Sequence, residues 1–146
     1  MAKTFSKIYG LAGARIGYAI AHPETIKSLS SYQPWPDAGV SIVSGAAAMA
    51  SLNDQDFVKQ CREKAKAARE MCYDCFKKLS LEYIPSFTNF ILFNIDKIKG
   101  DFTSQMLAKN IYVQFREHFG GKWCRVSMGT IEEMQQFCNA LKEIAS

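Results

Sequence analysis

Apolar residues recur at helical spacing over most of this chain. The longest pattern follows the polar residues 53–56, which suit the start of a helix, and continues as one stripe as far as Leu79. Shorter patterns begin at Pro23, a residue that suits the first turn of a helix, and behind Asp101, a candidate cap. The spacing predicts helices over residues 23–32, 41–52, about 55–79, 102 to about 110, and 131–144.

The first strand is expected before these helices. Residues 15–21 form a short apolar run that ends at Pro23, and we interpret this run as a buried strand. Two prolines and a glycine then make residues 33–39 a loop, in which Trp35 is a candidate for packing or for lining a site.

The second half of the chain changes from helical to strand-like spacing. Gly120 and Gly121 indicate a turn between two short apolar runs, and Thr130 with Glu133 has the spacing of a capping box. The strands predicted here cover residues 89–95, 111–115 and 123–128. Three strands covered by helices make a small α/β lobe.

Composition limits the classes of function. The 146 residues, 48% hydrophobic and 22% charged, suit a soluble globular protein of one domain or two small lobes. A formal net charge of +4, without dense runs of Lys and Arg or a zinc-finger spacing, argues against a nucleic-acid partner. There is no apolar run of membrane-spanning length, and the first residues do not begin a signal peptide. We therefore expect a cytoplasmic protein without a membrane partner.

The five cysteines do not have the spacing of a disulfide framework. Cys72 and Cys75 form a C-x-x-C pair, but they lie deep inside a helical pattern and have no second ligand pair nearby. Free, buried thiols are the favoured interpretation, and no metal site is expected.

Residues 4–18 concentrate the candidate chemistry. Lys7 follows the hydroxyl residue Ser6, and glycines at positions 10, 13 and 17 surround Arg15. A lysine amine condenses with a carbonyl only in its neutral form, which poor solvation or a neighbouring cation favours. Arg15 is a candidate for that cation and for binding an anion such as a phosphate. From the residues alone, a solvated lysine beside a loop is an equally good interpretation.

The same stretch resembles a known motif. The segments Thr4-Phe5-Ser6-Lys7, Gly10-Leu11-Ala12-Gly13 and Arg15-Ile16-Gly17-Tyr18 are similar to the lysine motif of class I/II aminotransferases, above all the histidinol-phosphate aminotransferase branch. In that family the lysine forms a Schiff base with pyridoxal 5′-phosphate, and the serine and the arginine bind the cofactor's phosphate. The resemblance implies that Lys7 is catalytic and that Ser6, Lys7 and Arg15 bind the cofactor.

A second segment is similar to the same family. Residues 123–130 resemble the motif whose arginine binds the substrate α-carboxylate, which implies this role for Arg125. From strand alternation alone, Arg125 faces solvent equally well. Arg116 lies near the place of an arginine that meets the distal phosphate of the substrate, although an exposed loop arginine explains it as well. His118 has no evident catalytic partner, and we expect it on the surface.

The resemblance implies an α/β fold, namely the C-terminal part of the aspartate-aminotransferase-like fold. Residues 1–40 would be a remnant of the large cofactor-binding domain, residues 41–80 a helical connection, and residues 81–146 a complete small α/β domain. The family's phosphate-cradling loop, the aromatic residue stacked on the cofactor and the aspartate that pairs with the ring nitrogen lie outside this match. We therefore expect a fragment with a truncated large domain, weak cofactor binding and no activity alone.

The implied reaction is transfer of an amino group between an amino acid, such as histidinol phosphate or an aromatic amino acid, and a 2-oxo acid, by a homodimer. Two other classes remain open. One is a decarboxylase of the same fold, of the threonine-phosphate type. The other is a non-catalytic fragment that packs against a partner, for which exposed apolar surface would be the mark.

Overall fold

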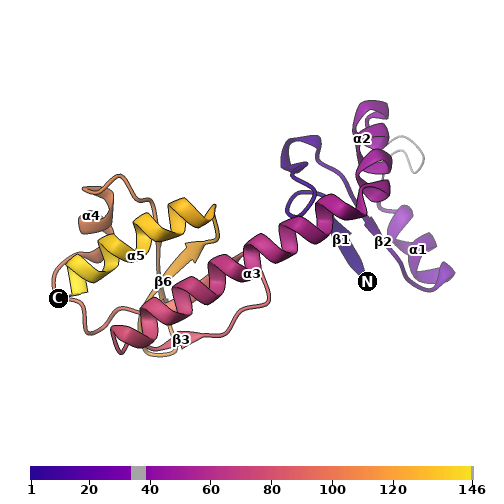
Figure 1. Ribbon diagram of the computed structural model, residues 1–146. Coiled ribbons are helices and arrows are strands. Elements are labelled where there is room, and N and C mark those ends of the chain that lie inside the picture. The colour runs from indigo at the N-terminus through magenta and orange to yellow at the C-terminus, as the bar shows by residue number, and fades with distance from the viewer. Residues whose placement is uncertain (34–38, 146) are drawn as a thin grey trace. The chain divides into compact units, whose positions relative to one another are not determined.

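The computed structural model of the protein describes residues 1–33 and 39–145, so the predicted loop's Trp35 lies outside the described residues. The chain forms two compact units, Met1–Arg62 (unit 1) and Glu63–Ser146 (unit 2) (Figure 1). Unit 1 holds β1 (Ala2–Thr4), the short 3-10 helix η1 (Ala12–Ala14), β2 (Gly17–Ala19), α1 (Pro23–Ser30), α2 (Ile42–Asn53) and the start of α3 (Gln55–Lys78). Unit 2 holds the rest of α3, β3 (Tyr83–Ile84), β4 (Phe90–Asn94), α4 (Phe102–Leu107), β5 (Gln114–His118), β6 (Gly121–Ser127) and α5 (Ile131–Ala145). The predicted domain limits at residues 40 and 80 stay a prediction.

Strand β2 corrects one expectation. The predicted strand is present as Gly17–Ala19, but all three of its residues are exposed rather than buried. Among the described residues it pairs only with β1, antiparallel, with Thr4 opposite Gly17. A two-stranded ribbon buries little by itself, because burial needs further strands or a packed layer. The apolar run predicted the strand correctly but could not reveal what covers it.

Helices α1 and α2 confirm the predictions for residues 23–32 and 41–52. Pro23 occupies the first turn of α1, where its missing N–H costs nothing. Helix α2 is mostly small and apolar, yet Ala48 is its one buried residue. Most of its apolar surface therefore faces outward in unit 1.

The long helix α3 is confirmed, and its cap acts as predicted. The Asp54 carboxylate accepts a hydrogen bond from the Phe57 backbone N–H at 3.0 Å. The apolar stripe of α3 is buried mainly in unit 2, where Ala68, Cys72 and Phe76 are fully buried. In unit 1, Val58 is buried but Phe57 is 44% exposed. Arg69 of this helix donates to the Thr88 carbonyl at 2.9 Å.

Unit 2 contains a four-stranded antiparallel sheet in the order β3-β4-β6-β5. The sequence predicted three of these strands and missed β3, whose two residues are too few for a periodic signal. Strands β4 and β6 form the centre, with Leu92 opposite Arg125. Alternation sends Ile91 and Phe93 into the core and leaves Leu92 on the other face.

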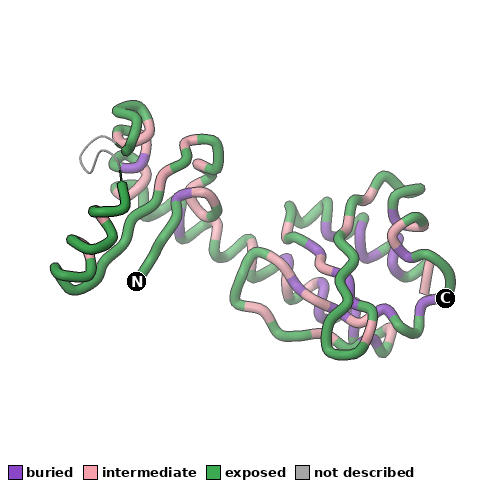
Figure 2. Tube along the Cα trace, turned by 180° about the vertical axis from the view of Figure 1, so that it is seen from behind, coloured by how far each residue is buried: buried purple, intermediate pink, exposed green. Residues whose placement is uncertain are grey.

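Three aromatic rings hold the core of unit 2 together. Phe93 of β4 stacks on Phe76 of α3 at 4.6 Å between centroids and meets Phe137 of α5 edge-on at 6.0 Å. All three side chains are no more than 1% exposed. Figure 2 shows the buried residues concentrated in this unit, whereas the trace of unit 1 is mostly exposed.

The β5–β6 hairpin corrects another expectation. Strand β5 runs over Gln114–His118 rather than 111–115, and the turn consists of Phe119 and Gly120 rather than Gly120 and Gly121. Both turn residues have positive φ, 53° and 72°, which is the conformation of a two-residue hairpin turn. A bulky residue such as Phe119 gives no local signal for this conformation, so the glycine pair misplaced the turn. Arg116 consequently lies within a strand, not in a loop.

The caps predicted in the second half are confirmed. The Asp101 carboxylate accepts from the backbone N–H groups of Thr103 and Ser104, and it starts α4. At α5, Glu133 donates its N–H to the Thr130 hydroxyl at 3.2 Å, while its carboxylate accepts from the Thr130 N–H at 2.7 Å.

The cysteines are free thiols, and four of the five are buried in unit 2, whereas Cys61 is half-buried. Burial raises the pKa of the Cys124 thiol to about 12, which keeps this group protonated and unreactive at neutral pH. No helix in residues 1–33 and 39–145 is long and apolar enough to cross a membrane.

Candidate functional site

The loop that carries the candidate lysine is closed by the backbone of one buried residue. The Phe5 N–H donates to the Ile16 carbonyl at 3.2 Å, and the Phe5 carbonyl accepts from the Leu11 N–H at 3.0 Å. The Phe5 side chain is 3% exposed and lies 4.9 Å from the Tyr9 ring and 5.8 Å from the Tyr18 ring. These contacts fold residues 5–16 back on themselves and fix where the segment after Phe5 begins.

Two of the three motif glycines are required by the backbone. Gly10 has φ +68°, and a side chain on Gly17 would lie 2.7 Å from the Lys3 carbonyl oxygen of the paired strand. A side chain on Gly13 would contact nothing within 4 Å, and its φ is not positive. Gly10 and Gly17 therefore shape the loop, and Gly13 is free of such a constraint in unit 1.

Ser6 and Lys7 follow directly on this anchor. The Thr4 hydroxyl donates to Ser6 Oγ at 2.9 Å and accepts from the Ser6 N–H at 3.1 Å. Because Ser6 Oγ is the acceptor, its own hydroxyl hydrogen is left to donate to another group. The Lys7 side chain is exposed, and its carbonyl accepts from the Gly10 N–H at 2.9 Å.

Arg15 lies at the other end of the same loop, in a left-handed conformation with φ 50° that ends η1. One guanidinium nitrogen, Nη1, donates to the Ala12 carbonyl at 2.8 Å. The side chain is exposed, and the remaining guanidinium N–H groups have no other acceptor among the described residues.

The chemistry of these side chains fits pyridoxal 5′-phosphate. Ser6 offers a hydroxyl donor and Arg15 a guanidinium, the two kinds of donor that bind a phosphate well, and Lys7 offers an amine for an aldehyde. A hollow of about 440 Å³ lies in the same unit, with an almost entirely apolar lining that includes Phe5, Tyr18 and Met49. Unit 1 thus supplies both polar donors and an apolar wall, while leaving Lys7 in solvent.

Arg125 lies in unit 2, on the face of the sheet opposite the core. Its neighbours Cys124 and Val126 point into the core, so alternation turns the half-buried Arg125 outward. The guanidinium carbon lies 4.1 Å from the centre of the Phe90 ring of β4. Nη1 donates to Gln114 Oε1 at 3.0 Å. A ring and an amide therefore hold the guanidinium in one orientation.

Arg116 shares a partner with Arg125. It follows Gln114 by two residues on β5, and its Nη2 donates to the same Gln114 Oε1 at 2.8 Å, while Nη1 donates to the Phe115 carbonyl at 2.8 Å. Gln114 itself pairs directly with Arg125 across the ladder. Gln114 carries no sequence signal for this role, because only the strand register sets it opposite Arg125.

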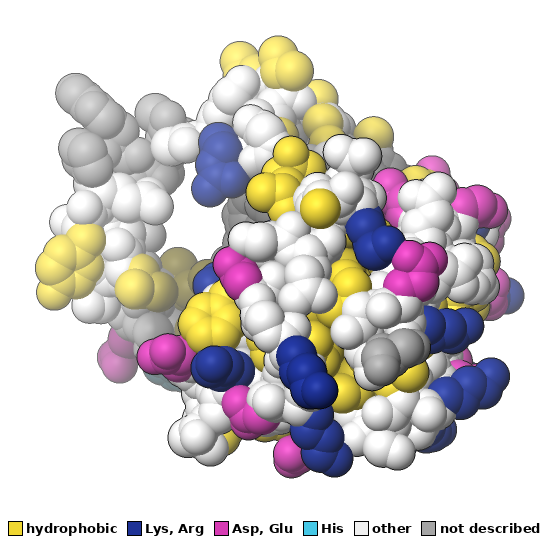
Figure 3. Space-filling view, turned by 90° about the vertical axis from the view of Figure 1, so that its left-hand side faces the viewer, with side chains coloured by type: hydrophobic (Ala, Val, Ile, Leu, Met, Phe, Trp, Pro, Cys, Tyr) yellow, Lys and Arg dark blue, Asp and Glu magenta, His cyan; other side chains and the backbone are white. Residues whose placement is uncertain are grey.

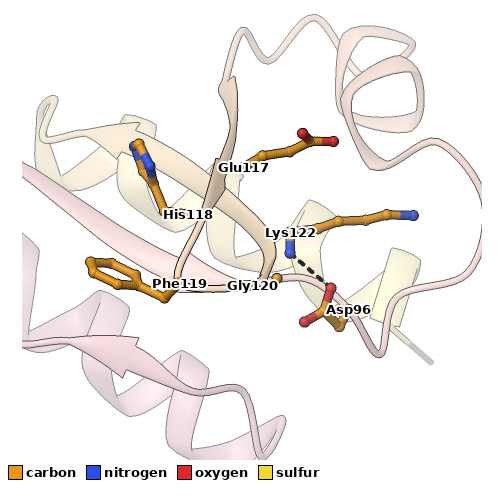
Figure 4. Close-up of a pocket in the computed structure, with 7 residues that line it drawn as sticks. Asp96, Glu117, His118, Phe119, Gly120 and Lys122 are labelled. Atoms are coloured by element: carbon orange, nitrogen blue, oxygen red, sulfur yellow. Dashed lines mark hydrogen bonds between the residues drawn. The ribbon is translucent and has the colours of Figure 1, made fainter.

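A second hollow, of about 460 Å³, surrounds the β5–β6 turn (Figure 4). The Asp96 carboxylate accepts from the Asn94 amide and from the Lys122 N–H at 2.8 Å each, and these bonds hold the pKa of Asp96 below its usual range. His118 and Phe119 lie on one side of the hairpin, and Glu117 with Lys122 on the other. His118 is exposed, as expected. Asp96 stabilises the hairpin through its hydrogen bonds to Asn94 and Lys122.

The predicted residues therefore fall into two groups. Ser6, Lys7 and Arg15 share one closed loop of unit 1, and Arg116 with Arg125 shares one sheet face of unit 2. Among the described residues, no cluster of His, Cys, Asp or Glu has the geometry to hold a metal ion. Acidic and basic side chains are interspersed on the face drawn in Figure 3.

Comparison with known proteins gives these groups a family context. Histidinol-phosphate aminotransferase of Moorella thermoacetica is 37% identical over 97% of this chain, which spans 36% of that protein's length. The solved structure of histidinol-phosphate aminotransferase from Sinorhizobium meliloti, in complex with pyridoxal-5′-phosphate, is similar with a TM-score of 0.80 and 31% identity. That match covers 99% of this chain and 40% of the other.

A more distant structure confirms the predicted fold. A double mutant of Thermus thermophilus aspartate aminotransferase matches with a TM-score of 0.82 at 21% identity, covering 98% of this chain and 40% of that one. The chain thus has the α/β fold of part of an aspartate-aminotransferase-like protein. The family model for aminotransferase class I and II matches residues 1–141. Since this match covers nearly the whole sequence and the Ser6-Lys7 loop lies within it, the chain belongs to the class I and II aminotransferase family.

Proposed function

We propose that this protein serves the transfer of an amino group between an amino acid and a 2-oxo acid, with pyridoxal 5′-phosphate as cofactor. The observation that carries the proposal is the closed loop of unit 1, which presents Ser6, Lys7 and Arg15 from one short segment. Family membership supports it, because the matched region includes both this loop and Arg125.

In this proposal, unit 1 holds the cofactor. The Ser6 hydroxyl and the free guanidinium N–H groups of Arg15 would hold the phosphate, and the Lys7 amine would hold the cofactor by condensing with its aldehyde, with loss of water. When bound, pyridoxal 5′-phosphate supplies an electron sink for the electron pair released at the substrate's α-carbon. The substrate's amino group would displace Lys7 from the cofactor, and the neutral Lys7 Nζ released in this way would act as the general base that takes the proton from that α-carbon.

Arg125 binds the substrate α-carboxylate. A guanidinium makes two parallel hydrogen bonds to a carboxylate, and this geometry orients the substrate as well as attracting it. Phe90 below the guanidinium and Gln114 beside it limit its rotation. Arg116 adds a second positive charge on the same face.

The finer assignments follow from the relatives. We propose histidinol phosphate or an aromatic amino acid as the amino donor, since histidinol-phosphate aminotransferases are among the similar proteins. Histidinol phosphate carries a phosphate ester in place of an α-carboxylate, so Arg125 would bind that phosphate, and the carboxylate of an amino acid or 2-oxo acid at the same position. We also propose a homodimer in the cytoplasm. The chain spans 36% to 39% of the length of the curated relatives it matches, so these assignments concern the activity of the whole protein.

A single-turnover assay tests the proposal. The protein is incubated with pyridoxal 5′-phosphate and then with each candidate amino acid, and the 2-oxo acid and carbon dioxide are both measured. If the protein transfers an amino group, we expect one equivalent of 2-oxo acid and no product in Lys7→Ala. Arg125→Lys should bind the amino acid more weakly, so a higher amino-acid concentration should be needed for half-maximal product. Release of carbon dioxide in place of the 2-oxo acid would favour a decarboxylase instead, and equal product from Lys7→Ala would contradict the assigned role of the lysine.

A further inference from the structure

The Gln114 side chain accepts hydrogen bonds from two arginines of unit 2. Its Oε1 accepts from Arg125 Nη1 at 3.0 Å and from Arg116 Nη2 at 2.8 Å. A guanidinium offers only donors, so the amide must present its oxygen to both, and this fixes which way the amide points. The two charged nitrogens can be no further apart than the sum of these two distances.

The arrangement follows from the strand ladder. Gln114 lies opposite Arg125, and Arg116 lies opposite Trp123, so all four side chains leave the same face of the sheet. Trp123 is 4% exposed, whereas Gln114 and Arg116 are exposed. Two like charges held this close repel each other, and a single neutral oxygen offsets that repulsion only in part.

No acidic side chain neutralises the pair. Among the described residues, neither guanidinium lies within ion-pair distance of a carboxylate, and the two ion pairs present in unit 2 involve lysines. Each guanidinium keeps N–H groups that do not contact Gln114, and the Gln114 Nε2 group has no acceptor among the described residues. The group therefore offers several donors and two positive charges to one external anion.

We propose that Gln114 is a positioning residue that joins Arg116 to Arg125, so that both guanidiniums bind one anionic group of the substrate. This inference rests on the proposed function, because it takes Arg125 as the carboxylate-binding residue, and it goes further in two respects. Arg116 acts on the same anionic group as Arg125 rather than on a distal phosphate. The site also accepts a phosphate in place of a carboxylate, because two guanidiniums stabilise a dianion more than a monoanion.

The test follows the arginine side chains directly. The ¹⁵N-labelled chain is titrated with inorganic phosphate and, separately, with acetate, and the Nε–Hε signals of Arg116 and Arg125 are monitored by NMR. Arg116→Lys and Arg125→Lys assign the two signals. We expect both signals to move with one shared dissociation constant, and phosphate to bind more tightly than acetate.

Variants of Gln114 separate positioning from folding. Gln114→Met keeps the side-chain length and removes the acceptor, and it should weaken phosphate binding about tenfold and make the two dissociation constants diverge. Gln114→Glu keeps the acceptor oxygen but adds a negative charge beside both guanidiniums, so neither arginine signal should respond to phosphate. The matched control is Gln136→Met at an exposed position of α5, which should change neither.

Three outcomes would overturn the inference. Different dissociation constants at Arg116 and Arg125 in the unaltered chain would show two separate sites. An unchanged, shared constant in Gln114→Met would show that Gln114 does not position the pair. Signals unaffected by phosphate at both arginines would contradict this inference and the anion-binding role in the proposed function, whereas the first two outcomes would leave that role intact.

Discussion

Units 1 and 2 have similar proportions of apolar residues, but unit 2 buries far more of them. Among the described residues of unit 1, only Phe5, Ala48 and Val58 are buried apolar residues, whereas α3, α4, α5 and the sheet of unit 2 enclose one continuous cluster. The candidate cofactor residues lie in the unit with little core. The difference shows that the stability of unit 2 can be explained from its own contacts, while the shape of unit 1 depends on a few backbone bonds around Phe5.

Helix α2 makes the contrast clear. Ile42 is 91% exposed, Val43 77% and Met49 63%, in a helix with only three polar side chains among its twelve residues. The last helix, α5, instead buries Met134, Phe137 and Leu141 along one stripe. Exposed apolar surface on this scale is typical of a binding surface.

The largest expected effect comes from equal truncations in the two units. Phe93→Ala removes a fully buried ring of unit 2 and should lower the free energy of unfolding by about 3–5 kcal/mol. Phe57→Ala, at a position that is 44% exposed, should cost less than about 1 kcal/mol. Urea unfolding followed by circular dichroism measures both, and equal costs would contradict the contrast between the units.

Glycine substitutions test the loop of unit 1. Gly17→Ala places a methyl group 2.7 Å from the Lys3 carbonyl oxygen, so it should destabilise the β1–β2 pair by about 1–3 kcal/mol. Hydrogen exchange of the Phe5 and Ile20 amides should then become faster. Gly13→Ala, which meets nothing within 4 Å, is the matched control and should leave these rates unchanged. Equal rates in both variants would contradict this account of the loop.

Dye binding tests the exposed surface of α2. An apolar fluorescent dye should bind the unaltered protein, and Val43→Lys on the exposed face should reduce its fluorescence by a modest fraction. The unfolding midpoint of unit 2 should stay constant, because Val43 lies outside its core. Gln135→Lys on α5 is the control for added charge, and an equal loss of fluorescence there would exclude α2 as the binding surface.

The smallest effect concerns pH and belongs to unit 2. The Ser104 hydroxyl and N–H hold the pKa of Asp101 below its usual range. A lowered folded-state pKa stabilises the protein above the unfolded value, about 3.9, and this contribution is lost as the pH falls through the folded value. Asp101→Asn should therefore lose stability near neutral pH and show a weaker dependence between about pH 5 and pH 2 in thermal unfolding. Parallel pH curves for the two proteins would show that this cap is not titrating.

Local signals predicted much of this fold. The helices and the caps at Asp54, Asp101 and Thr130 depend on residues within one turn of each other, so the sequence was sufficient to place them. The family motif likewise placed Lys7 and Arg125, which the structure sets in a closed loop and on an outward sheet face.

Features that depend on distant pairing could not be predicted. The β5 strand was placed three residues too early, because its start is set by the ladder with β6 and by the positive φ of Phe119. The contact between Gln114 and Arg125 joins residues that are eleven positions apart in sequence, so no local pattern could predict it. The exposure of β2 had no sequence signal, since an apolar strand has the same pattern whether or not another layer covers it.

The most direct test of the central claim is to find which lysine bonds to pyridoxal 5′-phosphate. The protein is incubated with the cofactor, reduced with borohydride and digested, and the modified peptides are identified by mass spectrometry. We predict that the adduct concentrates on Lys7, disappears in Lys7→Arg and persists in Lys3→Arg, a matched change at another exposed lysine of the same unit. An adduct spread over the exposed lysines of both units, with Lys7 modified no more than Lys3, would contradict the claim.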